Sequence, residues 1–180
     1  KDGFAFSDAY FKMDADITLP DGWKPIGATK DGRVNLQKGA NLNAFSGIFD
    51  GAGHTITVPE GGLPLFGYVR NTRIRNLNIY GKKIAGYGLV NNFEGVGLSG
   101  SAVEIDNVTL KSGSSTLKSG LLGANKTVNG YAGCSAAFVA TITNCTIEKG
   151  VVVGYDKKQS QIGAIAGRMQ GTIKNCVSYA

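Results

Sequence analysis

A short alternation of apolar and polar residues occurs four times along the chain and breaks phase in each copy. The pattern is Ile, any residue, Asn, apolar, any residue, apolar, and the last copy lacks its final apolar position. The copies span residues 73–79, 104–110, 141–147 and 172–178. Such alternation predicts β-strands, with Ile74 facing a core and Arg75 facing outward. The asparagines are 31, 37 and 31 residues apart, a spacing typical of solenoid repeats.

The asparagine of each copy lies where the alternation shifts by one residue. Leu77 is apolar although it directly follows Asn76, so two strands meet at this point. Asparagine tolerates the left-handed backbone conformation that a bend there requires. Stacked copies would place these residues above one another, and we expect a structural ladder of buried amides formed by Asn76, Asn107, Asn144 and Asn175.

A glycine-rich apolar stretch precedes most copies, at residues 65–69, 88–90, 120–123 and 162–167. Glycine at both ends of a short apolar run suits a strand that turns sharply. Short strands of one direction, coiled on themselves, predict an all-β fold, a parallel β-helix or solenoid. An antiparallel sandwich is the competing fold, but no Asn-Gly or Asp-Gly turn joins matched strands in the repeats. Helical repeats are disfavoured because no stretch keeps a 3.6-residue period for three turns.

The repeats do not extend over the whole chain. Residues 1–60 lack them, and we expect an N-terminal capping segment and the first coils there. Residues 61–180 are expected to form the repeat coils of the same single domain. Because no capping segment follows the fourth copy, we expect the parent protein to continue beyond Ala180.

Composition changes this picture little. The chain has 180 residues, 42% of them hydrophobic, enough for one domain with a substantial core. The segments between repeats are polar or glycine-rich and differ in length, which is where binding residues usually lie. Four aromatic residues in or beside them are candidates for ligand contact, although packing over the coil edges is the alternative: Tyr80, Tyr87, Tyr131 and Tyr155.

Three cysteines without CxxC spacing argue against a zinc ribbon or a thioredoxin-like site. Cys145 and Cys176 occupy the apolar position after the ladder asparagine. They are therefore expected to be buried free thiols, with a disulfide between them as the alternative.

His54 is the only histidine, which excludes a three-histidine zinc site and an HExxH site. In a catalytic role it would need a carboxylate, and Asp50 is the obvious partner in the sequence. We expect His54 to be structural. Asp14 and Asp16 lack a third ligand at calcium-loop spacing. The sequence therefore predicts no catalytic residue, no metal site and no cofactor.

The net charge of +6 is distributed unevenly, with −2 over residues 1–60 and +8 over residues 61–180. The basic residues are scattered and form no block of the kind that marks a binding arm, so no nucleic-acid partner is expected. No apolar run approaches 18 residues, so no membrane insertion is expected either.

One stretch resembles a known family. The order YFKMDADITL, WKPIG, FSGIFDGAGHTI, LFGYV and IRNLNI is similar to bacterial surface proteins with GLUG repeats, most specifically over residues 45–79. The resemblance covers residues 10–180. Gly120-Leu121-Leu122-Gly123 is its cleanest repeat, whereas Gly88-Leu89-Val90-Asn91 lacks the closing glycine. It implies a right-handed parallel β-helix in a secreted or wall-attached bacterial protein, such as an adhesin or the non-catalytic N-terminal region of an IgA-specific metalloendopeptidase.

These features predict a non-catalytic extracellular or cell-surface module for adhesion or glycan contact, although the sequence carries no signal peptide. Its partners would be a host or microbial glycan, an extracellular protein, or neighbouring domains of the same polypeptide. The alternative is a carbohydrate-active enzyme, a polysaccharide lyase or hydrolase on a β-helix. No repeat carries the paired carboxylates that such a site needs, because residues 61–180 offer only Glu94, Glu104, Asp106, Glu148 and Asp156.

Overall fold

A computed structural model of the chain describes residues 9–27, 44–94, 103–123, 139–156, 162–167 and 169–180. These residues form fourteen β-strands and no helix, and every strand pair among them is parallel. The chain is thus an all-β protein with a large parallel sheet, and the antiparallel sandwich and the helical repeat are excluded for the described part.

The strands are short, and most of them meet a bend or a turn after two to five residues. They are β1 (Tyr10–Lys12), β2 (Ile17–Thr18), β3 (Ile48–Asp50), β4 (Thr55–Thr57), β5 (Phe66–Arg70), β6 (Thr72–Tyr80), β7 (Val90–Glu94), β8 (Val103–Leu110), β9 (Ser115–Thr116), β10 (Val139–Thr143), β11 (Thr146–Ile147), β12 (Val152–Val153), β13 (Gln170–Lys174) and β14 (Val177–Ser178).

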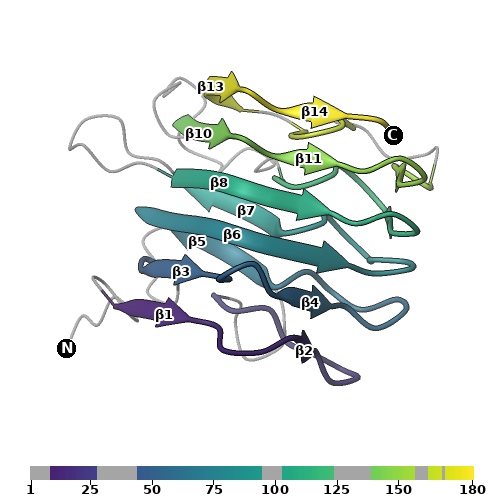
Figure 1. The fold of residues 1–180 in the computed structure, drawn as a ribbon, viewed down its shortest axis with the longest axis horizontal. Helices are drawn as coiled ribbons and strands as arrows, with labels where there is room; N and C mark the ends of the chain where they lie inside the picture. The colour runs from purple at the N-terminus through teal and green to yellow at the C-terminus, as the bar shows by residue number, and fades with distance from the viewer. Residues whose placement is uncertain (1–8, 28–43, 95–102, 124–138, 157–161, 168) are drawn as a thin grey trace, which may run out of the picture.

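Ten of these strands form one sheet whose order is β1-β3-β6-β8-β10-β13, with β2, β4, β11 and β14 continuing the same rows beyond a bend. We call each row a level, so the described residues have six levels: β1 with β2, β3 with β4, β6, β8, β10 with β11, and β13 with β14. Figure 1 shows the levels stacked from purple β1 to yellow β13 and β14, with the two edges of the sheet at opposite ends of the molecule.

The register of the levels matches the spacing of the sequence repeats. Ile74 lies opposite Ile105, Ile105 opposite Ile142, and Ile142 opposite Ile173. A second apolar column beyond the bend contains Ile79, Leu110 and Ile147. Side chains in both columns face one hydrophobic cluster, and those of the interior levels are fully buried. Burial of these columns selects the register, because a slip by one residue would move each apolar set to the outer face.

The glycine-rich stretches stack against one another on another side of this cluster. Strand β5 pairs with β7, and isolated bridges join Val90 to Leu122 and Leu122 to Ala166. A side-chain carbon on Gly120 would lie 1.9 Å from the carbonyl oxygen of Ala164. Glycine is therefore required there because the neighbouring backbones approach too closely for any side chain.

The expected left-handed bend at each repeat is confirmed. The φ angles are 52° at Asn76, 52° at Asn107, 55° at Asn144 and 54° at Asn175. The first two levels have no such asparagine, and the second turns instead through Gly51-Ala52-Gly53, where Ala52 and Gly53 have positive φ. The bend changes the direction of each level while leaving apolar residues on the core side of both halves.

Removing a core side chain from an interior level is expected to cost far more stability than the same change at the end of the stack. Ile105→Ala should lower the free energy of unfolding by about 2–5 kcal/mol, because Ile105 is fully buried and leaves a cavity. Ile173→Ala is the matched control in the same column, and its loss should be well below that of Ile105→Ala because Ile173 is 49% exposed. Urea unfolding of both variants measures the difference, and equal losses would contradict the stacking.

Candidate functional site

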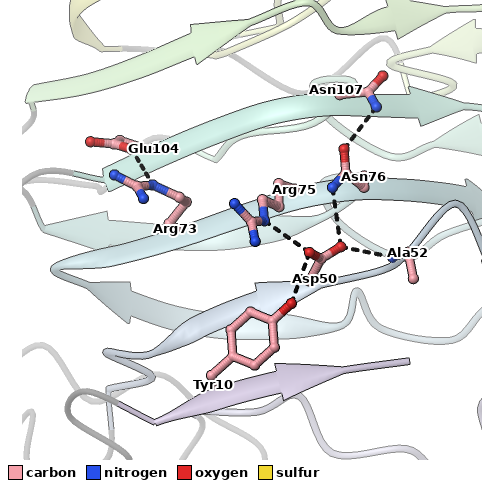
Figure 2. Close-up of polar contacts among 8 residues, drawn as sticks. All are labelled: Tyr10, Asp50, Ala52, Arg73, Arg75, Asn76, Glu104 and Asn107. Carbon is pink, nitrogen blue, oxygen red and sulfur yellow. Dashed lines mark hydrogen bonds and ion pairs between the residues drawn. The ribbon is translucent and has the colours of Figure 1, made fainter. Parts of the chain in front are cut away.

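A row of polar side chains crosses the outer face of the sheet just before the bend. In-register pairing aligns Lys12, Asp50, Arg75, Asp106, Thr143 and Lys174, one from each level. The neighbouring column places Arg73 beside Glu104. Figure 2 shows that the side chains of Asp50, Arg75 and Asn76 converge on one point between adjacent levels. This row crosses all six levels of the sheet.

Asp50 is the centre of this arrangement and is buried. One carboxylate oxygen accepts hydrogen bonds from the Tyr10 hydroxyl at 3.1 Å and from Arg75 Nε at 2.9 Å. The other accepts from the Ala52 amide at 2.9 Å and from Asn76 Nδ2 at 3.1 Å. Asp50 therefore joins side chains from three successive levels (Figure 2).

The contacts determine the charge state of Asp50. Burial alone would raise the pKa of this carboxyl group, but the hydrogen bonds from Ala52, Asn76, Tyr10 and Arg75 outweigh burial and lower the pKa to about 2. Asp50 is therefore ionised at neutral pH and is a hydrogen-bond acceptor only. It cannot act as a general acid, which needs a raised pKa.

The ladder asparagines each donate their amide to the preceding level, but they do not form one continuous ladder. Asn107 Nδ2 donates to Asn76 Oδ1 at 2.9 Å, and Asn175 Nδ2 donates to Asn144 Oδ1 at 3.3 Å. Asn144 donates instead to the carboxylate of Asp106 at 2.7 Å, and that carboxylate also accepts from the Thr143 hydroxyl. A charged acceptor replaces the amide at this step because it forms the stronger hydrogen bond.

The expectation that these amides are buried is wrong. Asn107, Asn144 and Asn175 are exposed, and Asn76 is half-buried. The left-handed residue directs its side chain to the outside of the bend, while Leu77 and its equivalents occupy the core. The asparagines thus link levels along the surface of the sheet.

Two further ion pairs connect adjacent levels. Arg73 pairs with Glu104, and Lys111 pairs with Glu148. Glu148 also accepts a hydrogen bond from the Ser112 amide at 2.7 Å. Lys111 and then this amide lower the pKa of Glu148. The carboxylates of Glu104 and Glu148 therefore both bind groups on an adjacent level.

His54 lies beside Asp16, and not beside Asp50, the carboxylate expected from the sequence. His54 Nδ1 is 3.2 Å from Asp16 Oδ1, whereas Asp50 is occupied by the four groups named above. The Thr55 amide donates to the same Asp16 oxygen at 2.9 Å and is the largest cause of the lowered pKa of Asp16. Among the described residues, no group of three or more metal-ligating side chains occurs.

Both described cysteines are free thiols. Cys145 is buried and Cys176 is half-buried. The Cys145 amide donates to Cys176 Sγ at 3.4 Å, so the two residues are stacked at adjacent levels. Burial raises the pKa of Cys145 to about 12, which leaves it protonated and unreactive at neutral pH.

The candidate aromatic residues differ in accessibility. Tyr80 is partly exposed at the end of β6, and Tyr155 is partly exposed with Lys83 Nζ 5.7 Å from its ring centroid. Tyr87 is buried beneath Lys118, so its ring is not available for stacking on a ligand. The alternative role expected from the sequence, packing, therefore applies to this residue. Tyr131 lies outside the described residues.

No protein-family model matches the chain, and neither curated proteins nor solved structures give a match. A helix of the length and apolar character needed to cross a bilayer is not found in the described ranges.

The polar row can perform structural work and offers little for chemistry. Its carboxylates, Asp50 and Asp106, are already bound to groups on neighbouring levels, and no nucleophile in the row stands next to an available base. Sequence reasoning missed Arg75 as a member of this row, and Tyr10 and Arg73 as members of the neighbouring column. Tyr10 and Arg73 align with Glu104, and Arg75 aligns with Asp50, only once the strand register of the structure is known.

Asp50→Asn is expected to lower the free energy of unfolding at neutral pH. It should also make this free energy depend less on pH in the acid range. The folded pKa of about 2 lies below the ordinary value of 3.8, so the stabilisation is fully present above about pH 5 and is lost as the pH falls towards 2. The shift corresponds to about 2 kcal/mol. Urea unfolding at several pH values measures it. Glu60→Gln, which removes an exposed ion pair with Lys82, is the control and should change stability little. An unchanged pH slope in Asp50→Asn would contradict the assignment.

Substitutions at Asn107 separate the bend from the amide contact. Asn107→Ala should cost about 1–2 kcal/mol of unfolding free energy because alanine is disfavoured at a φ of 52°. Asn107→Gly keeps the left-handed conformation and loses only the hydrogen bond to Asn76, so its cost should be smaller. Thermal or urea unfolding ranks the two variants. Glycine being the more destabilising of the two would show that the bend is not the main requirement.

Proposed function

We propose that the chain is a right-handed parallel β-helix module of a bacterial surface or secreted protein, and that it is a non-catalytic scaffold for adhesion or glycan contact. Three stacks of parallel pairing around one hydrophobic cluster support the helical winding: the ten-stranded sheet, the β5–β7 stack with its bridges, and β9 with β12. Parallel crossovers are right-handed in almost all proteins, which supports the handedness. The resemblance to GLUG-repeat proteins supports the bacterial surface setting.

The proposal that the chain is non-catalytic rests on the contacts that its carboxylates make. Asp50, Asp106, Glu104 and Glu148 each bind groups on a neighbouring level. The pKa values of Asp16, Asp50 and Glu148 are lowered. Glycoside cleavage needs one carboxyl group with a raised pKa close to a second, available one. Asp50 and Glu148 are shifted in the opposite direction, and the carboxylates of Asp106 and Glu104 are already bound to groups of the stack.

The surface best suited to ligand contact lies at the turn after β6. We call it the Lys82 corner and define it as Tyr80, Lys82, Lys83 and Tyr155. Lys82 and Lys83 are exposed, and the Glu60 carboxylate lies 3.9 Å from Lys82 Nζ, at the long limit for an ion pair. Aromatic rings with exposed ammonium groups suit a sugar that carries carboxylate or sulfate. The ligand class proposed for this corner is therefore an acidic glycan.

Binding of the purified chain to acidic and neutral polysaccharides tests this proposal. A sulfated glycosaminoglycan and polygalacturonate should bind, and dextran should not. Tyr155→Ala and Lys82→Ala should each weaken binding by about 3- to 10-fold, since each removes a contact worth 0.5–1.5 kcal/mol. Tyr179→Ala is the matched control and should leave binding unchanged, because Tyr179 is 63% exposed and lies on the last level, three levels beyond Tyr80. Absence of binding to both acidic polymers would refute the contact role.

The same experiment distinguishes the carbohydrate-active alternative. Polysaccharide incubated with the chain should remain at its original length, because the carboxylates of the described levels are bound within the stack and form no acid and base pair for cleavage. Release of reducing ends or unsaturated products, abolished by a substitution at one of the carboxylates, would favour the enzyme over the scaffold.

A further inference from the structure

The turns that follow β6, β8 and β11 lie above one another at one side of the sheet, one turn from each of three successive levels (Figure 1). The strands pair in register on both sides of these turns: β6, β8 and β11 before them, and β9 with β12 after the last two. Gly113 and Gly150, which have φ angles of 81° and 87°, occupy the same position in the turns of the fourth and fifth levels. Ser112 and Lys149 are therefore equivalent residues of adjacent levels.

Exposed cations occur at the first and the last of these three turns. The third level carries Lys82 and Lys83, and the fifth carries Lys149. The turn between them has the uncharged Ser112 at the position of Lys149. Glu148, which precedes Lys149, already binds the fourth level through an ion pair and a backbone amide. Within the described ranges, Lys149 itself forms no ion pair. The two lysine turns are two level spacings apart, about 9–10 Å.

The same side of the first two levels carries the opposite charge. Asp21 lies in the turn after β2 and Glu60 in the turn after β4, and both residues are exposed. An anionic ligand would be repelled by these two turns and attracted by those of the third and fifth levels. The charges therefore favour a ligand that extends from Lys82 towards Lys149 and not towards the first level.

The spacing of the lysine turns determines how an acidic glycan can use them. Two level spacings are comparable with the length of a disaccharide unit, and glycosaminoglycans that contain uronic acid carry at least one anionic group in each such unit. A glycan chain parallel to the stack can place one anionic group at Lys82 and the next at Lys149. The uncharged turn of the fourth level would then lie beneath the bond between the two units. A glycan chain that crosses the stack would meet one of the two lysine turns and miss the other.

We propose that the Lys82 corner binds an acidic polysaccharide lengthwise, with the polymer parallel to the stack and successive anionic groups at the turns of the third and fifth levels. Lys149 is then a second contact outside the corner as defined above. The inference rests on the proposed binding of acidic glycans and adds the orientation of the polymer. It also sets a minimum length, because anionic groups in two successive disaccharides require a tetrasaccharide.

Nuclear magnetic resonance titration of the chain with chondroitin sulfate oligosaccharides of two, four and eight sugars tests the proposal. The tetrasaccharide should bind about 2- to 5-fold more tightly than the disaccharide, because it forms one further exposed ion pair. Lys149→Ala should remove most of this gain and leave the affinity of the disaccharide for the Lys82 corner unchanged. Lys12→Ala is the matched control, since it removes an exposed lysine from the first level, and it should alter neither affinity.

Longer oligosaccharides also offer more binding positions, and the gain that persists in Lys149→Ala measures this statistical effect. Unfolding midpoints verify that the variants fold. Absence of binding by all three oligosaccharides, or binding that Lys82→Ala and Tyr155→Ala leave unchanged, would refute the acidic-glycan contact and this inference with it. Binding that depends on Lys82 but gains as much with length in Lys149→Ala as in the unmodified chain would overturn the lengthwise orientation alone.

Discussion

Each of the last four levels of the sheet bends at a residue with positive φ, and the protein meets this requirement with asparagine. The bend lets one continuous run of chain bury Ile74 before it and Leu77 after it against the same cluster. Without the left-handed residue, strict alternation would turn one of the two halves outward. The bend also places one amide per level on the outer surface, where it binds the level below. Core packing, strand register and surface contacts therefore all depend on four backbone conformations.

The surface contacts use acidic side chains of the described residues to join one level of the sheet to the next. In a stack of parallel strands, like side chains would lie directly above one another, and like charges at that distance repel. The chain avoids this by alternating charge along its columns, with Asp50 beside Arg75 and Arg73 beside Glu104. The pairing joins the levels of the stack and, at Asp50, lowers the pKa of the carboxyl group. This use of charge supports the proposed scaffold role, in which ligand contact would be made at the turns.

Much of the repeat region could be predicted from the sequence, because each level there uses the same residue types at the same positions. The spacing of the Ile-x-Asn motif gave the register, and the phase break gave the left-handed bend. The Asp50 cluster could not be predicted in this way. The first two levels lack the asparagine, and Phe11, Phe49 and Ile74 follow one another at intervals of 38 and 25 residues, so nothing in the sequence aligns Tyr10 or Asp50 with Arg75. The partner of His54 was missed for the same reason. The outward position of the asparagines depends on side-chain direction in a left-handed residue, which strand alternation does not describe.

The most direct test of this account is a nuclear Overhauser experiment on the chain with labelled isoleucine methyl groups. Adjacent parallel strands are 4.7–4.9 Å apart, and levels two steps apart are about twice as far. The account predicts methyl cross-peaks from Ile74 to Ile105, from Ile105 to Ile142, and from Ile142 to Ile173, and weak or absent ones between Ile74 and Ile142. Strong contacts between levels that are not adjacent, or none between adjacent ones, would contradict the stacked register on which the account rests.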